Sequence, residues 1–345
     1  MIGVVCLNPA LDITHHVAAV DWAGVNRASA VYARPGGKGL NVARTLHALG
    51  AEVLVMGLVG GATGEALTAG LAALAVPAAF TWVRGDTRRT FTVVDARTGH
   101  AALFNEPGPR IAADGYTEFR ARYASVLAGC AAMVLSGSLP LGLPGGSYAE
   151  LTAMAAAAGV PVLLDAHGEA LRLGAAAGPA IVKPNLAELE AFAGRPLSGP
   201  GGSGAGGSAQ AGVDRRAVAA AARELRMSGP GAVVVSLGAD GLQADTGDGC
   251  LEAVPPAVVA RNATGAGDAA AAGLAHGLAL GCPWDERLRH AVALGTAAAL
   301  APVAGEFSPA DYAAVRAGVT VMRAGDEAAG HGSASEAGVA PGEAG

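Results

Sequence analysis

Lysine is scarce in this chain, and positive charge is not in excess. Only two of the 23 basic residues are lysines, Lys38 and Lys183, and the other 21 are arginines. The formal net charge of −6 argues against a nucleic-acid partner, because proteins that bind phosphate backbones carry a basic surface. In a chain that uses arginine for its ordinary surface charge, we expect the two lysines where a compact ammonium group is needed.

Cysteines are few, and long apolar runs are missing. The four cysteines are far apart and form no C-x-x-C pair: Cys6, Cys130, Cys250 and Cys282. This spacing gives no zinc site and no thiol redox motif, so we expect reduced thiols in a cytoplasmic protein. The longest apolar run, near Ala291, is interrupted by Pro302, and the first residues lack the basic region of a signal peptide. We therefore expect no membrane segment.

Several common catalytic motifs are also absent from the sequence. It contains no G-x-x-x-x-G-K-[ST], no G-x-G-x-x-G after the first predicted strand, no H-E-x-x-H and no G-x-S-x-G. The sequence therefore gives no motif evidence for four classes of protein: P-loop nucleotide hydrolases, ordinary dinucleotide-binding enzymes, zinc proteases and serine hydrolases of the α/β type.

The 345 residues are 52% hydrophobic and 15% charged, a composition typical of a large globular protein with one or two domains. Short runs rich in valine and leucine alternate with alanine-rich stretches of helical period, which predicts an α/β fold with a mostly parallel sheet. Strands are predicted at residues 3–7, 53–58, 133–135, 160–165, 181–183 and 232–237. Helices are predicted at residues 40–49, 65–74, 116–127, 147–157, 186–193, 214–227, 268–280 and 284–300.

Four segments depart from this alternation. Residues 13–34 and 87–104 have the pattern of antiparallel strands and predict a small sheet added to the main domain. Residues 198–212 are almost entirely glycine, serine and alanine, and predict a flexible insertion. Residues 324–345 contain no Lys, Arg, Phe, Trp or Tyr and predict a disordered tail. The folded domain is expected to span residues 1–323.

Two glycine-rich loops lead directly into predicted helices. In the first, Gly36, Gly37 and Gly39 let backbone approach a ligand, the helix start offers free N–H groups, and Lys38 adds a positive charge. This combination suits a polyol or a sugar phosphate. The alternative is a plain loop that closes onto a helix, with a solvated lysine.

The second loop, at residues 262–268, has the sequence NATGAGD. Its amides can hold a phosphoryl group, while the acid at the helix start, Asp268, suits a proton acceptor rather than an anion-binding residue. The alternative is that Asp268 only complements the helix dipole.

Two further motifs lie at the ends of predicted strands. Asn185 and Glu188, three residues apart at a helix start, could orient waters on a magnesium ion that bridges nucleotide phosphates. The alternative is a capping box between the same two residues, and both readings can hold. The segment SLGADG at residues 236–241 could border an adenine ring or form a simple hairpin.

Taken together, six motifs occur in the order found in ribokinase-like (PfkB) sugar kinases. They are NPALD at 8–12, GGKGLNVA at 36–43, SGSLP at 136–140, KPNLAELE at 183–190, SLGADG at 236–241 and TGAGD at 264–268. The chain resembles this family over roughly residues 1–323. The segments NPALD and NEPGP, the latter at 105–109, are similar to those of its phosphosugar branch, whose members act on fructose 1-phosphate, tagatose 6-phosphate or fructose 6-phosphate.

The resemblance implies a ribokinase-like three-layer α/β sandwich, in which the small sheet is a lid over the sugar. It implies ATP-dependent phosphorylation of a hexose monophosphate, above all of fructose 1-phosphate to fructose 1,6-bisphosphate, with the two 6-phosphates as alternatives. A non-enzyme alternative is an inactive regulator that binds a sugar phosphate, but a regulator would not require Asp268 and an intact glycine loop. In these relatives the lid often pairs two subunits, which implies a homodimer.

The resemblance also implies roles for matching positions. Asp268 would be the catalytic base, and the amides of Gly265, Ala266 and Gly267 would form an anion hole for the transferring phosphoryl group. The residues implied at the sugar are Asp12, Gly36, Gly37 and Asn41, with Lys38 and Arg88 near its phosphate. The residues implied at the nucleotide are Lys183, Asn185, Ser236, Gly238, Thr264, Gly265 and Gly267, with Asn185 and Glu188 holding Mg²⁺ through water. Two positions depart from the family pattern, since Ala62 stands where aspartate is common and His167 where serine is usual.

Overall fold

The computed structural model describes residues 1–198, 212–301 and 305–323. The predicted glycine-rich insertion lies almost wholly outside the described residues, and the predicted tail lies outside them entirely. In the described part, the four cysteines form no disulfide, and no helix is long and apolar enough to cross a membrane.

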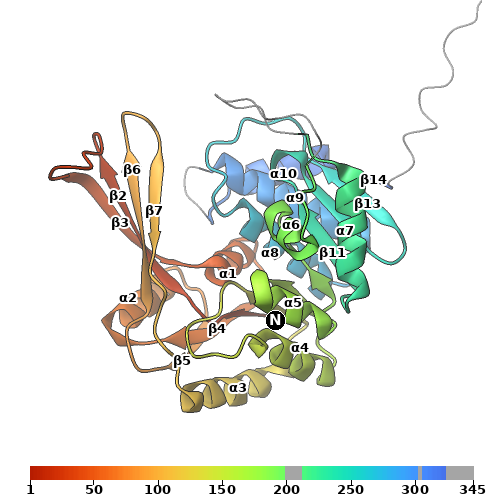
Figure 1. The fold of residues 1–345 in the computed structure, drawn as a ribbon, viewed down its shortest axis with the longest axis horizontal. Helices are drawn as coiled ribbons and strands as arrows, with labels where there is room; N and C mark the ends of the chain where they lie inside the picture. The colour runs from red at the N-terminus through yellow and green to blue at the C-terminus, as the bar shows by residue number, and fades with distance from the viewer. Residues whose placement is uncertain (199–211, 302–304, 324–345) are drawn as a thin grey trace, which may run out of the picture.

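A ten-stranded sheet forms the centre of the molecule, in the order β14-β13-β12-β11-β10-β9-β8-β1-β4-β5 (Figure 1). Its strands are β1 Ile2–Cys6, β4 Val53–Val59, β5 Ala78–Trp82, β8 Ala132–Ser136, β9 Val162–Asp165, β10 Ile181–Val182, β11 Ala232–Ser236, β12 Leu242–Asp245, β13 Cys250–Val254 and β14 Thr320–Arg323. All pairs from β11 to β5 are parallel, and β12, β13 and β14 add antiparallel strands at one edge. The mostly parallel sheet predicted from the sequence is confirmed.

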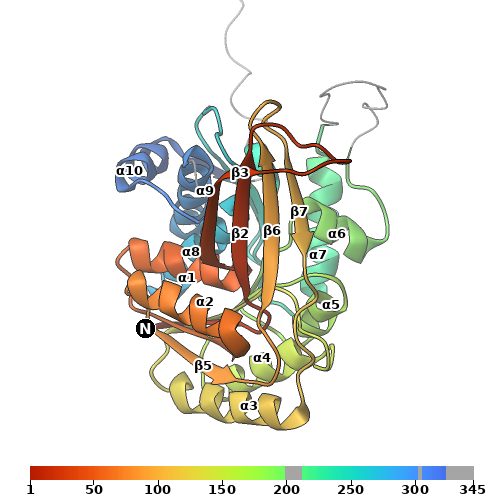
Figure 2. The ribbon, with the colours of Figure 1, turned by 90° about the vertical axis from the view of Figure 1, so that its left-hand side faces the viewer.

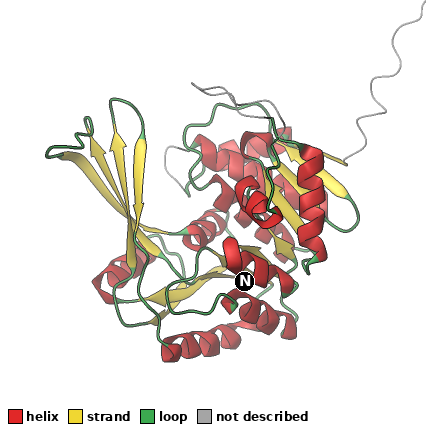
Figure 3. Ribbon diagram, viewed as in Figure 1, coloured by secondary structure: helices red, strands yellow, loops and turns green. Residues whose placement is uncertain are grey.

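Helices cover both faces of this sheet (Figure 3). They are α1 Lys38–Ala48, α2 Gly61–Ala73, α3 Ala113–Leu127, α4 Ser147–Ala157, α5 Gly168–Ala176, α6 Leu186–Ala193, α7 Arg215–Met227, α8 Ala266–Ala279, α9 Trp284–Leu300 and α10 Pro309–Gly318. Side chains of β1 alternate between two cores. Val4 belongs to the core that includes α1, α2, α8, α9 and α10, and Val5 belongs to the core that includes α3 to α7. The three-layer α/β sandwich is therefore confirmed.

The second sheet stands beside this sandwich with the order β3-β2-β6-β7, as Figure 2 shows face-on. Its strands are β2 Ala10–Val17, β3 Ala28–Gly36, β6 Arg88–Asp95 and β7 Ala101–Asn105. The pairs β3–β2 and β6–β7 are antiparallel, as predicted from the sequence. The central pair of β2 and β6 is parallel, and for this pair the prediction of antiparallel strands is wrong. The reason is that both strands enter the lid from the same side, after the carboxyl ends of β1 and β5. The lid also reaches beyond its predicted bounds, because β3 continues to Gly36 and so runs directly into the first glycine-rich loop.

Six elements have no counterpart among the predicted strands and helices: α5, α10, β5, β12, β13 and β14. The strands β13 and β14 lie near an open sheet edge and are only half-buried, so they lack the continuous apolar run of a central strand. The helix α5 follows His167, which occupies its N-cap without a side-chain hydrogen bond. Serine, the usual residue at this position in the family that the sequence resembles, can cap a helix in this way, so its replacement removed the sequence signal for the helix start.

Helix α8 is held close against α9 by small residues. A Cβ atom at Gly273 would lie 2.6 Å from the Cα atom of Ala291, so only glycine allows this approach. At the other end of the contact, a Cβ atom at Gly295 would lie 3.0 Å from the carbonyl oxygen of Ala266. The first turn of α8, which carries Asp268, is thereby fixed against a second helix rather than left in a loop.

Candidate functional site

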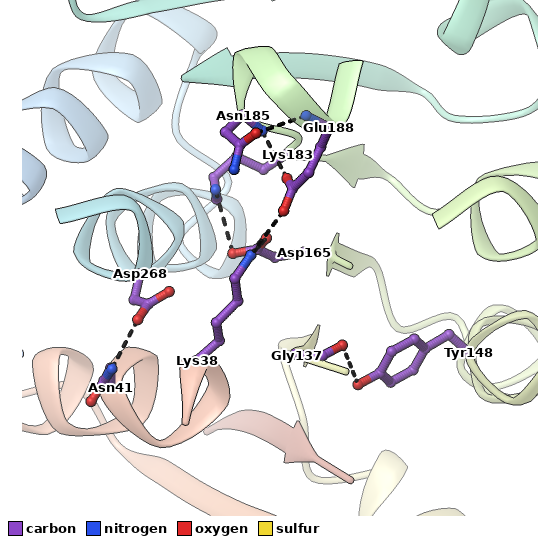
Figure 4. Close-up of polar contacts among 9 residues, drawn as sticks. All are labelled: Lys38, Asn41, Gly137, Tyr148, Asp165, Lys183, Asn185, Glu188 and Asp268. Carbon is purple, nitrogen blue, oxygen red and sulfur yellow. Dashed lines mark hydrogen bonds and ion pairs between the residues drawn. The ribbon is translucent and has the colours of Figure 1, made fainter. Parts of the chain in front are cut away.

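Asp268 lies in the first turn of α8, at the end of the second glycine-rich loop. The N-cap residue of α8, Gly265, has φ 84°, a left-handed conformation that favours glycine. The Asp268 side chain is only 8% exposed, and its Oδ2 atom accepts a hydrogen bond of 2.9 Å from Nδ2 of Asn41 on α1 (Figure 4). Two helix starts that are far apart in the sequence therefore meet through this bond.

Asp165 is the centre of the charged contacts around Asp268. It is the last residue of β9 and is completely buried. Its Oδ1 atom lies 3.1 Å from Nζ of Lys38, and its Oδ2 atom lies 3.4 Å from Nζ of Lys183. Both lysines of the chain thus pair with one carboxylate, as Figure 4 shows. Asp165 is not among the site residues predicted from the sequence, although an acid at the end of a buried apolar strand, VLLD, is a usable signal.

Lys38 also contacts the magnesium motif predicted from the sequence. Its Nζ atom lies 3.2 Å from Oε1 of Glu188. The Oε2 atom of Glu188 accepts from the backbone N–H of Asn185, and Oδ1 of Asn185 accepts from the backbone N–H of Glu188. The capping-box reading of these two residues is confirmed. Their role toward Mg²⁺ stays a prediction.

Three carboxylates, those of Asp165, Glu188 and Asp268, surround only two ammonium groups. Burial, and next the negative charge of Asp165, raise the pKa of Asp268 to about 6, against the opposing effects of Asn41 and the two lysines. Burial disfavours the charge of Lys38, but Asp165 and the other two carboxylates outweigh it and raise the pKa of Lys38 above its usual range. Asp268 is therefore ionised at neutral pH and still basic enough to accept a proton.

The backbone around Gly265 begins a helix next to a positive charge. The N–H groups of Gly265 and Gly267 have no hydrogen-bond partner within the described residues, whereas the N–H of Ala266 donates to the carbonyl oxygen of Ala263 at 3.2 Å. A Cβ atom at Gly267 would lie 3.9 Å from Nζ of Lys183. Free amides, a helix N-terminus and an ammonium group are the features that stabilise a phosphoryl group, so the geometry suits the predicted anion hole.

The other residues predicted at the nucleotide lie at the carboxyl end of β11. The N–H of Ser236 donates to the carbonyl oxygen of Pro184 at 3.0 Å, which sets the end of β11 beside Asn185. Gly238, with φ 64°, opens a short turn that leads into β12, so the hairpin reading of SLGADG is confirmed. The N–H of Thr264 donates to Oδ1 of Asn262 at 2.9 Å. The roles of these residues toward the nucleotide stay predictions.

The residues predicted at the sugar lie where the lid meets α1. A Cβ atom at Gly36 would lie 1.8 Å from Oδ2 of Asp12, so the glycine loop closes tightly on that carboxylate. Burial raises the pKa of Asp12. The Nε atom of Arg88 donates to the carbonyl oxygen of Asn8 at 3.1 Å, and its charge acts on Asp12. Asp12, Gly36 and Arg88 therefore lie together at the base of the lid, whereas Asn41 contacts Asp268 and Lys38 points to Asp165 and Glu188.

No cluster of three or more metal-ligating side chains is present in residues 1–198, 212–301 and 305–323. The site thus offers a buried carboxylate, amides at a helix N-terminus and two lysines, beside the carboxyl ends of the parallel strands. In an open α/β sheet this is where ligands bind, and groups of these kinds suit phosphoryl transfer.

Comparison with known proteins identifies the class. The protein-family model described as "pfkB family carbohydrate kinase" matches residues 5–311 of this chain. A 1-phosphofructokinase from Rhodobacter capsulatus is 37% identical over 309 residues, covering 89% of this chain and 92% of that protein. The structure of phosphofructokinase-2 from Escherichia coli in complex with fructose-6-phosphate is similar with a TM-score of 0.81 and 32% identity, over 92% of this chain and 98% of that one. An Arabidopsis thaliana ribokinase, at 19% identity and a TM-score of 0.70, over 91% of this chain and 98% of that one, shares the fold.

The chain belongs to the pfkB family of carbohydrate kinases. It is a phosphotransferase of ribokinase-like fold, and the family resemblance seen in the sequence is confirmed.

The first prediction concerns Asp268 as the base. Asp268→Asn keeps the size of the side chain but cannot accept a proton, so we expect kcat to fall by about a hundredfold to ten-thousandfold while substrate dissociation constants change little. In the unchanged protein, kcat/KM should fall as the pH drops below about 6, because protonation removes the base. Steady-state rates and calorimetric binding check both points, and turnover near the unchanged level would disprove the assignment.

The second prediction concerns Asp165. Asp165→Asn removes the negative charge that raises the pKa of Asp268, so the acidic limb of the kcat/KM profile should move to lower pH. Loss of one partner of a buried ion pair should also lower the free energy of unfolding by about 3–5 kcal/mol. A matched control is Asp245→Asn, which removes another buried carboxylate, 3.2 Å from Nε of Arg226. The control should lose stability without moving the acidic limb, and equal profiles for the two variants would refute the coupling.

Proposed function

We propose that the protein transfers the γ-phosphoryl group of ATP to fructose 1-phosphate and forms fructose 1,6-bisphosphate. The observation that carries this proposal is the hydrogen-bonded pair of Asp268 and Asn41 beside the amides of the glycine loop. The 37% identity to a 1-phosphofructokinase over 89% of this chain supports fructose 1-phosphate as the acceptor. The four free cysteines fit a reducing compartment, and we propose the cytoplasm.

The reaction follows from the positions of these groups. Asp268 takes the proton of the acceptor hydroxyl, and the hydroxyl oxygen forms a bond to the γ-phosphorus of ATP. The bond from that phosphorus to the bridging oxygen breaks, and ADP leaves with the electron pair. Asn41 holds the Asp268 carboxylate in place through its hydrogen bond. The loop amides and Lys183 balance the charge on the transferring group.

The donor set fits a magnesium ion that arrives on the nucleotide. Glu188 uses one carboxylate oxygen for Lys38 and the other for its own helix cap. Both oxygens are therefore occupied, which suits contact with the ion through water rather than a direct bond. Asn185 and Glu188 would hold the ion in this way, and the bound ion would reduce the negative charge of the phosphates.

A second acceptor deserves a direct comparison, because the similar structure from Escherichia coli was solved with fructose-6-phosphate. A coupled assay of ADP release should compare fructose 1-phosphate, fructose 6-phosphate, tagatose 6-phosphate, free fructose and ribose. We expect the highest kcat/KM with fructose 1-phosphate. A higher value with a 6-phosphate would change the acceptor, and binding of a sugar phosphate without any turnover would indicate a regulator instead.

We also propose a homodimer that forms through the lid. Residues alternate across the lid strands, so Asp12 and Thr90 share one face, while Ile13, Phe91 and Phe104 line up across the other. Phe104 is 52% exposed in the single chain. An apolar sheet face of this kind is stabilised when a second copy covers it with two-fold symmetry.

Light scattering at micromolar concentration should therefore give twice the chain mass. Phe104→Glu should shift the mass toward the monomer, since it places charge on the apolar face. The matched control is Leu103→Glu, because Leu103 is the preceding residue of β7, is equally exposed and points to the opposite face. A monomer mass for the unchanged protein, or equal effects of the two variants, would count against this interface.

A further inference from the structure

Two arginines beside the sugar region share a single carboxylate. The Nη1 atom of Arg34, on lid strand β3, pairs with Oε1 of Glu306. The Nη2 atom of Arg44, on α1, lies 3.8 Å from the same oxygen. The Arg44 side chain is only 9% exposed, and within the described residues its guanidinium donates no hydrogen bond. Within the described residues, Glu306 is therefore the one carboxylate at ion-pair distance from either arginine, and Asp12 acts on Arg44 from farther away.

Arg34, Arg44 and Glu306 lie next to Asp12 and Asn41, two of the residues predicted at the acceptor sugar. Arg34 is directly opposite Asp12 in the register of β3 and β2, so both side chains leave the same face of the lid. Arg44 lies one helical turn after Asn41, and its charge acts on Asp12. A Cβ atom at Gly305, the residue before Glu306, would lie 3.1 Å from Oδ1 of Asn41 and 3.4 Å from Nη1 of Arg44.

The charge balance here is the reverse of that around Lys38. Lys38 has two carboxylates within 3.2 Å, those of Asp165 and Glu188, so its charge is already compensated. Arg34 and Arg44 instead have one carboxylate between them, and a nearly buried guanidinium is costly without an anionic partner. Burial has the largest effect on the pKa of Arg44 and, together with the charge of Arg34, lowers it, although the carboxylates of Glu306 and Asp12 oppose the shift.

We propose that Arg34 and Arg44 bind the phosphate group that the acceptor sugar already carries, and that Glu306 is the counter-ion this phosphate displaces. Two guanidinium groups present pairs of N–H donors that match phosphate oxygens, and a dianion balances their charge better than one carboxylate does. The inference rests on the proposed phosphosugar kinase. It adds two specificity-determining residues, one from the lid and one from α1, to the predicted contact of Arg88.

The test is a set of single substitutions with two readouts, steady-state kinetics and calorimetric binding of fructose 1-phosphate to the full chain. Arg34→Gln and Arg44→Gln should each raise KM and Kd for fructose 1-phosphate by on the order of tenfold to a hundredfold, with KM for ATP unchanged. Glu306→Gln should act in the opposite direction and lower both constants, because it removes the competing internal anion. The matched control is Arg195→Gln with Glu224→Gln, an exposed ion pair between the segment that follows α6 and helix α7, which should change nothing.

Each outcome decides the question. If the arginine variants leave fructose 1-phosphate binding unchanged, or weaken ATP equally, the proposal is wrong. If Glu306→Gln weakens fructose 1-phosphate together with the arginine variants, the three residues only fasten the lid to the body. Arg44→Lys covers the case in which Arg44→Gln does not fold, since it keeps the charge and should lose affinity only in part. If the unchanged protein does not phosphorylate fructose 1-phosphate at all, the proposed function is wrong. If it does, and the arginine variants behave like the unchanged protein, only the inference about Arg34 and Arg44 is wrong.

Discussion

The buried carboxylate of Asp165 is the contact on which the site depends. It collects both lysines of the chain, one from the start of α1 and one from the end of β10, and it contributes the negative charge that keeps Asp268 a weak acid. A buried ion cluster of this kind is expensive unless every charge has a partner, which explains why the two lysines and Glu188 converge on one place. No lysine occurs elsewhere in the chain, which fits this assignment, because an ammonium group is a compact point charge and one can approach each oxygen of the carboxylate.

The topology brings these groups together from distant parts of the sequence. The strands β1, β9, β10 and β11 are parallel, so the segments that follow them lie at one edge of the sheet. The helices α1 and α8 begin at this edge, and the bond between Asn41 and Asp268 joins them. The lid starts from the same edge through β2 and returns through β3 directly into the first glycine-rich loop, which couples Asp12 to Gly36. A movement of the lid base would therefore displace the start of α1, the helix that carries both Lys38 and Asn41.

Local sequence signals were sufficient for the parts that depend on neighbouring residues. Glycine-rich loops before helices located Gly36 and Asp268, and the alternation of apolar runs predicted the α/β sandwich. Long-range contacts were out of reach: nothing near Asp165 in the sequence indicates that Lys38, 127 positions away, will pair with it. The same holds for Arg34, Arg44 and Glu306, and for the parallel pairing of β2 with β6. The capping box of Asn185 and Glu188 could be predicted from their spacing, but only the structure shows that Glu188 also pairs with Lys38.

The central claim is that burial and Asp165 keep Asp268 a weak acid in a site that also holds two lysines. The most direct measurement is a carbon-13 NMR titration of the aspartate side-chain carboxyl groups, with the Asp268 resonance assigned by its absence in Asp268→Asn. The account predicts a titration midpoint near 6 for this carboxyl. A midpoint near 4, the value of a solvated aspartate, would contradict it, because Asn41 and the lysines would then cancel the effects of burial and Asp165.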